Sequence, residues 1–393
     1  MMAKPYEKRI DWQRIYHKYR RSNAKKRSLL LDELCDLTGM NRKYLIRKLN
    51  KKKTKASKPR GAKPTYEPAI YLPLIKPIWL AADQICGKRL KVVLQDWLHF
   101  YEAEFDEIEE SIRIKVLQIS SATLDRLLKP IKVNYRGRGL CGTKPGSIIK
   151  NQIPIKTNQW EETKPGFMEA DTVAHCGTSL EGSFVWSLTM TDILLTWTEN
   201  RAVWNKGSHG VGSAIDDVEE NLPFEIKGFD CDNGSEFLNY HLIRKFAERP
   251  KEKAIQFTRS RPYKKNDNAH VEQKNWTHVR QLFGYHRFDK ECLVAMMNDL
   301  YRNEWSLYQN HFIPTMKCIK KVKINSKYQR KFDTPKTPYQ RVLDCPDISN
   351  EKKEVLKKVH QTLNPFELKR IIDKKLKRIF SNVQLNTTPR KKI

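Results

Sequence analysis

The chain has 393 residues, too many for one ordinary hydrophobic core and about right for two or three domains. Its 75 Lys and Arg exceed its 45 Asp and Glu, which gives a formal net charge of +30 at pH 7. This excess favours a polyanionic partner, because each phosphate neutralised by a Lys or Arg releases counterions. No stretch approaches the roughly 18 apolar residues of a membrane-spanning helix, and the start lacks the apolar core of a signal peptide. We therefore expect an intracellular, cytoplasmic protein with no membrane partner, associated with the nucleoid when bound.

Eight cysteines are scattered along the chain without a CxxC pair or another spacing typical of disulfide frameworks or structural zinc. We expect them to be reduced and structural. Hydrophobic residues make up 39% of the chain and aromatic residues 10%, which is enough to build cores. The composition therefore excludes a disordered polycation.

Residues 1–50 are predicted to form a helix-turn-helix domain. Gly39 interrupts a helical pattern of leucines, and Asn41 is placed to cap a second helix. The patterned leucines are Leu30, Leu34 and Leu37, and the side chains expected to point inward from the second helix are Tyr44, Leu45 and Leu49.

The outer face of that second helix is the predicted DNA-binding surface of the domain, and it comprises Asn41, Arg42, Lys43 and Arg47. An ordinary helical hairpin with a solvated basic face fits so short a segment equally well.

Three further segments precede the region rich in strands. Residues 51–66 are a basic linker, since they combine Pro, Gly and a run of positive charge without apolar periodicity. Residues 67–131 are predicted to form a second helical, helix-turn-helix-like domain, with Ser120 or Ser121 as a helix cap and Pro130 as a stop. Residues 132–160 are predicted to be an extended linker.

Residues 161–310 change to short apolar runs rich in β-branched and aromatic residues. Their pattern predicts the order β-β-β-α-β-α-β-α, an α/β domain with a mixed sheet. A further helix over residues 293–308 is expected to pack on that sheet. Residues 311–393 are predicted to be a basic, weakly structured region that ends in two helices over about 350–380, with a solvated amphipathic face as the default interpretation.

Three acidic residues lie where such a sheet would place a ligand site. Asp171 lies in the first strand, Asp232 follows the fourth, and Glu272 lies in the first turn of the last helix. Each alone has an ordinary structural explanation, as a strand-end turn, a helix cap or a charge favoured by the helix dipole. Together they form a hard-oxygen ligand set suited to Mg²⁺ or Mn²⁺. A basic loop before the last helix, with Lys264 and Lys265, is expected to face DNA.

The motifs around these residues resemble those of the integrase catalytic core of retroviral integrases and bacterial insertion-sequence transposases, the DDE family. The matching motifs are EADTV around Asp171, DNGSEF at residues 232–237 and V-E-x-x-N at residues 271–275. Between Asp232 and Glu272 lie 272 − 232 − 1 = 39 residues, slightly more than in retroviral integrases. The resemblance covers roughly residues 165–310.

The resemblance implies a ribonuclease H-like catalytic domain preceded by all-α helix-turn-helix domains. It implies metal-dependent DNA cleavage and strand transfer at two Mg²⁺ or Mn²⁺ ions, without a nucleotide cofactor. Asp171 would bridge both ions, Asp232 and Glu272 would each bind one, and Asn275 would orient the site or contact DNA. The partners would be double-stranded DNA, as element ends and target, and further copies of the chain in a homo-oligomer.

Several features stay open or depart from the retroviral pattern. Glu169, Asp230 and Asp267 are fallback ligands, with a charge at the edge of the site as the favoured interpretation of Asp230. The zinc module of retroviral integrases has no counterpart, which favours the insertion-sequence type. Trp276 replaces a frequent lysine and could stack on a base, although packing is more common. The rival functions are a catalytically silent DNA-binding regulator and a ribonuclease H-type nuclease.

Overall fold

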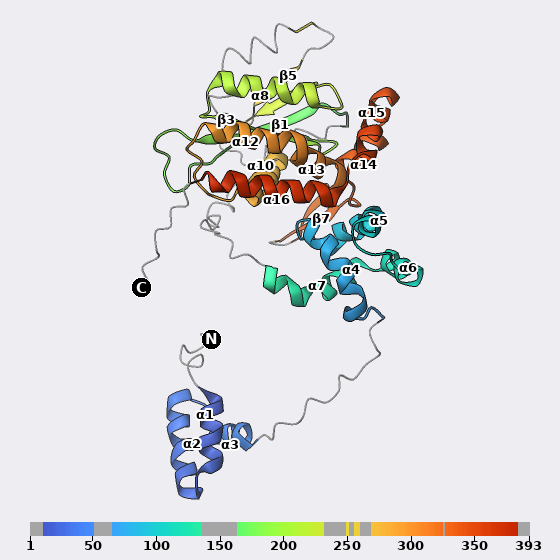
Figure 1. Cartoon of the computed structure of the whole chain (residues 1–393). Helices are drawn as coiled ribbons and strands as arrows, with labels where there is room; N and C mark the ends of the chain where they lie inside the picture. Colours follow the sequence, from blue (N-terminus) through green and yellow to red (C-terminus); the bar gives the residue numbers. More distant parts are fainter. Residues whose placement is uncertain are drawn as a thin grey trace. The chain divides into compact units, whose positions relative to one another are not determined.

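The structure is a computed structural model that describes residues 11–50, 65–135, 163–231, 249–250, 255–259, 269–324 and 327–383 (Figure 1). The chain divides into two compact units, Met1–Thr65 and Tyr66–Ile393. Within the described ranges, no helix is both long and apolar enough to cross a membrane. Residues 51–64 of the predicted basic linker and residues 136–160 of the predicted extended linker lie outside the described residues, as does the segment 232–248, where the second helix of the predicted β-β-β-α-β-α-β-α order falls.

The N-terminal unit contains three helices, α1 Trp12–Arg21, α2 Ala24–Thr38 and α3 Arg42–Asn50. Gly39 ends α2 with a φ of 67°, a left-handed conformation that favours glycine, and its N–H donates to Cys35 O at 2.7 Å. The Asn41 side chain accepts the Lys43 N–H at 2.9 Å and so caps α3. The predicted helix, turn and second helix are present at these positions.

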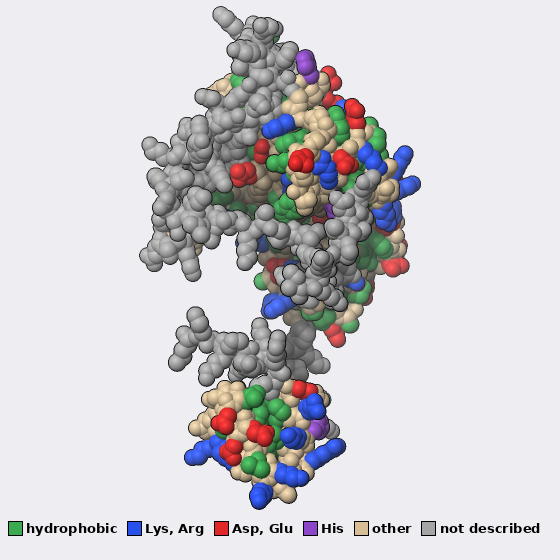
Figure 2. Space-filling view, turned by 90° about the vertical axis from the view of Figure 1, so that its left-hand side faces the viewer, with side chains coloured by type: hydrophobic (Ala, Val, Ile, Leu, Met, Phe, Trp, Pro, Cys, Tyr) green, Lys and Arg blue, Asp and Glu red, His purple; other side chains and the backbone are tan. Residues whose placement is uncertain are grey.

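The core of this unit is small, because few apolar side chains turn inward. Leu45 and Leu49 of α3 are buried, but Tyr44 is 47% exposed, so the prediction that Tyr44 points inward was wrong. Arg42 contacts α2, where it pairs with Asp32 and donates to Ser28 Oγ at 2.7 Å. Figure 2 shows one face of this unit, the smaller body, with basic side chains around the margin and acidic and hydrophobic ones in the middle.

The larger unit begins with four helices, α4 Pro68–Ala81, α5 Gly87–Glu104, α6 Glu110–Gln118 and α7 Ser121–Tyr135. Ser120 caps α7, since its Oγ accepts the Thr123 N–H at 3.1 Å. Pro130 does not stop the helix as predicted but lies inside α7. The helix continues past it because Leu127, Leu128 and Ile131 pack into a hydrophobic core on either side of the proline.

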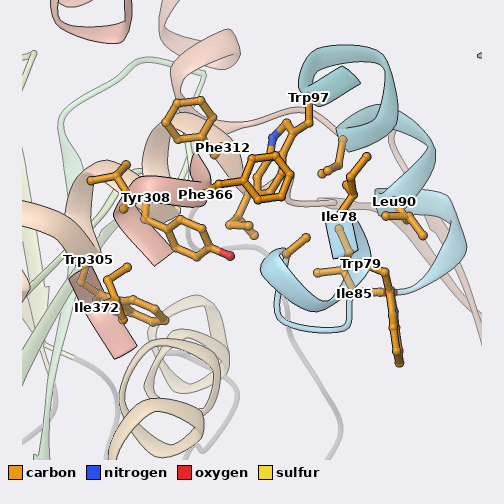
Figure 3. Close-up of a cluster of buried hydrophobic side chains, with 14 of the residues drawn as sticks. Ile78, Trp79, Ile85, Leu90, Trp97, Trp305, Tyr308, Phe312, Phe366 and Ile372 are labelled. Carbon is orange, nitrogen blue, oxygen red and sulfur yellow. The ribbon is translucent and has the colours of Figure 1, made fainter. Parts of the chain in front are cut away.

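That core is shared with the C-terminal part of the chain, so residues 66–393 form one unit. The indole of Trp97 in α5 lies 6.1 Å from the Phe312 ring and 5.5 Å from the Phe366 ring, between centroids (Figure 3). The Tyr308 hydroxyl donates to the backbone carbonyl of Ala81. The helices over residues 68–135 therefore pack as part of the sheet-bearing unit.

A five-stranded sheet with the order β3-β2-β1-β4-β5 lies at the centre of this unit. The first three strands pair antiparallel, whereas β4 pairs parallel with both β1 and β5. The bounds are β1 Phe167–Ala174, β2 Val185–Asp192, β3 Thr198–Trp204, β4 Gly228–Cys231 and β5 Gln256–Arg259. The predicted mixed sheet is confirmed, and it fits a ribonuclease H-like fold.

Helices cover both faces of the sheet (Figure 1). Helix α8, Ser208–Asn221, shares a hydrophobic cluster with Met168 and Ala170 of β1. The opposite face carries a helical segment from residue 269 to 283 and a second one from 292 to 312. The second segment was predicted, and its Asn298 side chain bonds both backbone groups of Ala202 in β3, at 2.7 and 2.8 Å.

Both segments on that face change from α-helix to π-helix and back. The first consists of α10 Ala269–Lys274, η3 Asn275–Arg280 and α11 Gln281–Phe283, and the second of α12 Cys292–Leu300, η4 Tyr301–Trp305 and α13 Ser306–Phe312. π-helical turns are rare in proteins, and those that occur are often found at functional sites.

The C-terminal region is more ordered than predicted. Its basic stretch forms an antiparallel hairpin, so the prediction of weak structure was wrong. The Thr315 and Lys336 backbones close its base with two hydrogen bonds of 2.8 and 3.1 Å. The elements are β6 Cys318–Ile324, β7 Lys327–Phe332, α14 Pro338–Asp344, α15 Asn350–Gln361 and α16 Pro365–Ser381. The terminal helices are confirmed, but α16 is more than a solvated helix, because Phe366, Ile372 and Ile379 are buried in the shared core.

The shared core leads to a stability prediction. Trp97→Ala should lower the free energy of unfolding of the larger unit by about 3–5 kcal/mol, because it leaves a cavity between α5, α13 and α16. Urea unfolding followed by circular dichroism measures the loss. Trp276→Ala is the matched control, since Trp276 is 45% exposed and its removal should change little. A Trp97 variant that unfolds only its helices, leaving the sheet transition unmoved, would contradict the shared core.

Candidate carboxylate site on the central sheet

The site is built on β1, whose alternating side chains point to opposite faces of the sheet. Met168 and Ala170 pack toward α8, so Glu169 and Asp171 point toward α10. β4 runs parallel beside β1, with Glu169 opposite Asp230 and Ala170 opposite Cys231. Asp171 therefore lies on the face that the last helix covers, as predicted.

Two hydrogen bonds from other described residues hold the Asp171 carboxylate. Its own strand supplies one, since the Thr172 N–H donates to Asp171 Oδ1 at 2.7 Å. The other comes from Asn275, whose Nδ2 donates to Asp171 Oδ2 at 2.7 Å. Asn275 is the first residue of the π-helical segment. The carboxylate is thus fixed in orientation from the helix that carries Glu272.

Glu272 lies one helical turn before Asn275, on the same side of the helix. Burial is the main cause that raises the pKa of Glu169, and the charge of Glu272 adds a small contribution. The Glu272 side chain is exposed, whereas Glu169 is 1% exposed. The structure therefore brings Asp171 and Glu272 to one face of the sheet.

Glu169 anchors the start of α10. Its Oε2 accepts the N–H groups of His270 at 3.0 Å and Val271 at 2.9 Å, where a negative charge or dipole complements the helix. Burial, with a smaller contribution from the charges of Asp230 and Glu272, raises the pKa of Glu169 to about 8 against the lowering effect of the two backbone bonds. The sequence suggested Glu169 as a fallback metal ligand. In the structure its buried side chain instead holds the first turn of α10.

Asp230 is also internal. It is 2% exposed, and its Oδ1 accepts the Thr258 hydroxyl from β5 at 2.7 Å. The interpretation of Asp230 as a charge at the edge of the site was wrong, because its side chain is buried and bonded to Thr258 of the neighbouring strand β5. Glu169, Asp230 and Thr258 lie side by side on β1, β4 and β5 and form a polar row across the sheet. Asp171 lies two residues further along β1 than this row.

The third predicted ligand, Asp232, lies outside the described residues, as do Lys264, Lys265 and Asp267. β4 ends at Cys231, the residue before Asp232 in the sequence. Among the residues that the structure describes, no group of three or more His, Cys, Asp or Glu is placed to hold a metal ion. Asp171 and Glu272 are the two predicted ligands whose positions are known.

Sequence reasoning missed Lys274, which points away from the carboxylates. Its side chain is buried, and its Nζ donates to Thr196 O at 3.2 Å. Burial, with a smaller contribution from the charges of Arg89 and Arg341, lowers the pKa of Lys274 to about 7. The signal was present in the sequence, because Val271, Lys274 and His278 recur at the spacing of one helix face and all are buried.

The other DNA-binding candidates lie in the N-terminal unit or on the helix surface. Lys43 and Arg47 are exposed on α3, whereas Asn41 is the cap of that helix and Arg42 is paired with α2. Trp276 is 45% exposed, so the interpretation that its ring packs in the core was wrong.

The fold and the site define an α/β protein with a mixed five-stranded sheet and a carboxylate pair between a central strand and a covering helix. The chain is 34% identical over 329 residues to the uncharacterized protein y4rM of Sinorhizobium fredii (strain NBRC 101917 / NGR234), covering 83% of this chain and 92% of that protein. The chain belongs to the same family as y4rM. No model of a known protein family matches the sequence.

Solved structures give weaker likenesses. The catalytic core domain of BIV integrase is 13% identical with a TM-score of 0.28, covering 46% of this chain and 94% of that one. A chain of the simian T-cell lymphotropic virus intasome in complex with PP2A regulatory subunit B56 gamma is 14% identical with a TM-score of 0.29, covering 44% of this chain and 68% of that one.

The environment of Glu169 leads to a prediction on pH. Its pKa is raised from 4.5 to about 8 in the folded chain, so ionising it as pH rises through that window opposes folding. Glu169→Gln keeps an oxygen for the two N–H groups and cannot ionise. We expect the variant to gain stability over the unmodified protein between pH 5 and 8, on the order of a few kcal/mol at the upper end.

The measurement is the thermal midpoint against pH, with EDTA present. Glu291→Gln, at an exposed position, is the control and should follow the unmodified protein throughout. Parallel curves for Glu169→Gln and the unmodified protein would show that Glu169 is ionised in the folded chain.

Proposed function

We propose that the protein is a DDE-type transposase or integrase that cleaves DNA and transfers the cut strand in a metal-dependent reaction. The observation that carries this proposal is the 2.7 Å hydrogen bond from Asn275 to Asp171, which joins the helix of Glu272 to the first strand of a mixed sheet. Asp232 directly follows β4, the parallel neighbour of β1, in the sequence. The net charge of +30 supports a polyanionic substrate.

The described residues fit a hard divalent cation by their chemistry. Asp171 and Glu272 offer carboxylate oxygens, the ligands that Mg²⁺ and Mn²⁺ prefer. Asn275 Oδ1 is buried beside Asp171 and has no hydrogen-bond partner in the described part of the chain. Two such ions, with Asp232 as the third ligand, would supply activation of the attacking oxygen and stabilisation of the leaving one.

The chain's own groups have distinct tasks in this proposal. Asp171 and Glu272 hold the charge of the site, and Asn275 fixes the Asp171 carboxylate in one orientation. Glu169 keeps α10 on the sheet without adding a charge at neutral pH, because its raised pKa keeps it largely protonated. Trp276 is exposed one residue after Asn275, where its ring can stack on a base.

The N-terminal unit is proposed to be a helix-turn-helix module that recognises duplex DNA through α3. Lys43 and Arg47 are exposed on that helix, while Asn41 and Arg42 set its position against α2. Lys264 and Lys265 are proposed to contact DNA from the loop before α10. We also propose that the protein acts as a homo-oligomer, because two element ends must be held together.

The test is a cleavage and joining assay with labelled duplexes from the inverted repeats that flank the gene, a target plasmid, and Mg²⁺ or Mn²⁺. Asp171→Asn and Glu272→Gln should each lower cleavage and joining roughly a thousandfold, since each removes a ligand from a site that stabilises several kcal/mol of charge. Binding of the duplex should remain.

The matched controls are Asp347→Asn and Glu291→Gln, which make the same chemical changes at exposed positions of the same unit. Binding without cleavage under either metal would replace the proposal with a DNA-binding regulator. Cleavage without joining would replace it with a ribonuclease H-type nuclease.

Asn275 gives a finer test as a positioning residue. Asn275→Ala removes the hydrogen bond to Asp171, so we expect the metal concentration for half-maximal cleavage to rise about 10- to 100-fold. Excess Mg²⁺ or Mn²⁺ should then restore much of the rate. Asn303→Ala, at an exposed site, is the control. A loss of rate that added metal does not restore would mean that Asn275 acts elsewhere.

A further inference from the structure

The hairpin of β6 and β7 borders a basic hollow of about 500 Å³ beside the start of α5. Its charged lining residues are Lys88, Lys320, Arg330, Lys331 and Asp333. We call this surface the hairpin hollow. It lies in the sheet-bearing unit, where β7 is seen close to α4 and α5 (Figure 1). Its four cations against one carboxylate make it strongly positive.

The charges in the hairpin hollow repel one another in the isolated protein. Lys320 lies directly opposite Lys331 in the antiparallel register, a like-charge pairing that destabilises a sheet. The one acidic residue is already engaged, since Asp333 pairs with Arg341 at 2.8 Å and accepts the Lys317 N–H at 2.7 Å. Within the described ranges, no ion pair reaches the four cations of the hollow. An anion from outside would relieve this repulsion.

The hairpin is fastened to the turn between β2 and β3. Lys317 Nζ donates to Leu194 O at 2.9 Å, and the Thr315 and Thr196 hydroxyls are 2.7 Å apart. The carbonyl of Thr196 in turn accepts Lys274 Nζ, from the helix that carries Glu272. These three side-chain contacts connect the base of the hairpin to α10 through the turn between β2 and β3.

The turn itself is strained, which indicates that these contacts hold it firmly. Thr196 has a φ of 59°, a left-handed conformation that is unusual and unfavourable for a β-branched residue. Thr196 is only 7% exposed, and its carbonyl, hydroxyl and N–H groups all have partners. The hairpin is thus set in a defined position relative to the carboxylate site.

We propose that the hairpin hollow binds the phosphate backbone of duplex DNA, with the β6–β7 ribbon as the inserted element and Lys88, Lys320, Arg330 and Lys331 as the phosphate contacts. The proposal rests on the proposed function in taking DNA as the polyanion. A two-stranded ribbon fits the major groove of B-form DNA, whereas the major groove of A-form RNA is too narrow to admit it. The exposed side chains of Val322, Ile324 and Phe332 supply apolar contacts beside the charges.

The test measures binding of a fluorescent duplex of arbitrary sequence by anisotropy, in EDTA, over a series of salt concentrations. The double variant Lys320→Gln with Lys331→Gln should bind roughly tenfold more weakly or worse at 0.1 M salt. The slope of log affinity against log salt should become shallower by about 1.8, which is about 0.9 for each of two phosphates that the variant no longer neutralises. Its thermal midpoint should be equal or higher, since a repulsive pair is removed.

The matched control is Lys352→Gln with Lys358→Gln, which removes the same charge from exposed positions of α15. It should keep both the affinity and the salt slope of the unmodified protein. Equal losses in the two double variants would reduce the effect to net charge and overturn the proposal. Aggregation of the hairpin variant without a change in affinity would also overturn it, by showing that the lysines only protect exposed strand edges.

The remaining outcomes separate this proposal from the proposed function. If the unmodified protein binds no duplex at all, both fail. If it binds and joins DNA while the hairpin variant keeps its affinity and salt slope, only the hairpin proposal fails. Tighter binding of single-stranded or duplex RNA than of duplex DNA, abolished in the hairpin variant, would overturn the assignment of the hollow to DNA.

Discussion

The two hydrogen bonds from the start of α10 to the buried carboxyl group of Glu169 are the interaction on which the rest of the site depends. They attach the first turn of α10 to Glu169, which lies in β1 two residues before Asp171. With the helix held there, Asn275 reaches Asp171 one turn after Glu272. Burial keeps Glu169 largely neutral at pH 7, so this support adds little repulsion to the carboxylates above it.

The same helix has two chemically different faces. One face carries Glu272 and Asn275, of which Asn275 bonds Asp171 on β1, and the face toward the protein interior carries Val271, Lys274 and His278. Lys274 ties this inner face to the strained turn at Thr196, and that turn is tied to the base of the basic hairpin. The helix that carries Glu272 and Asn275 is therefore connected, through Thr196, to the hairpin that forms the cationic hairpin hollow. The π-helical segment starts at Asn275, directly after Lys274.

Much of the fold could be predicted from the sequence because the relevant signals are local. Short apolar runs rich in β-branched and aromatic residues mark the strands at 167–174 and 185–192, and the spacing of leucines with Gly39 and Asn41 marks two helices and their turn. Signals that depend on distant partners were misread. Pro130 reads as a helix stop, but the core on both sides of it keeps α7 continuous. The lysines of the hairpin hide its strand pattern, because its pairing and closure depend on Thr315 and Lys336, 21 residues apart.

By itself the sequence determined the order of the strands, the placement of Asp171 on the first strand and the position of Glu272 in the first turn of a helix. Alternation along β1 also determined that Glu169 and Asp171 share a face. Only the tertiary structure decided that Glu169 and Asp230 are buried supports and that Asp171 is the member held by Asn275. The physical reason is that periodicity gives the direction of a side chain, whereas its depth is set by the helices and strands that cover it. Those elements are remote in sequence, with Glu169 and Val271 joined across 102 residues.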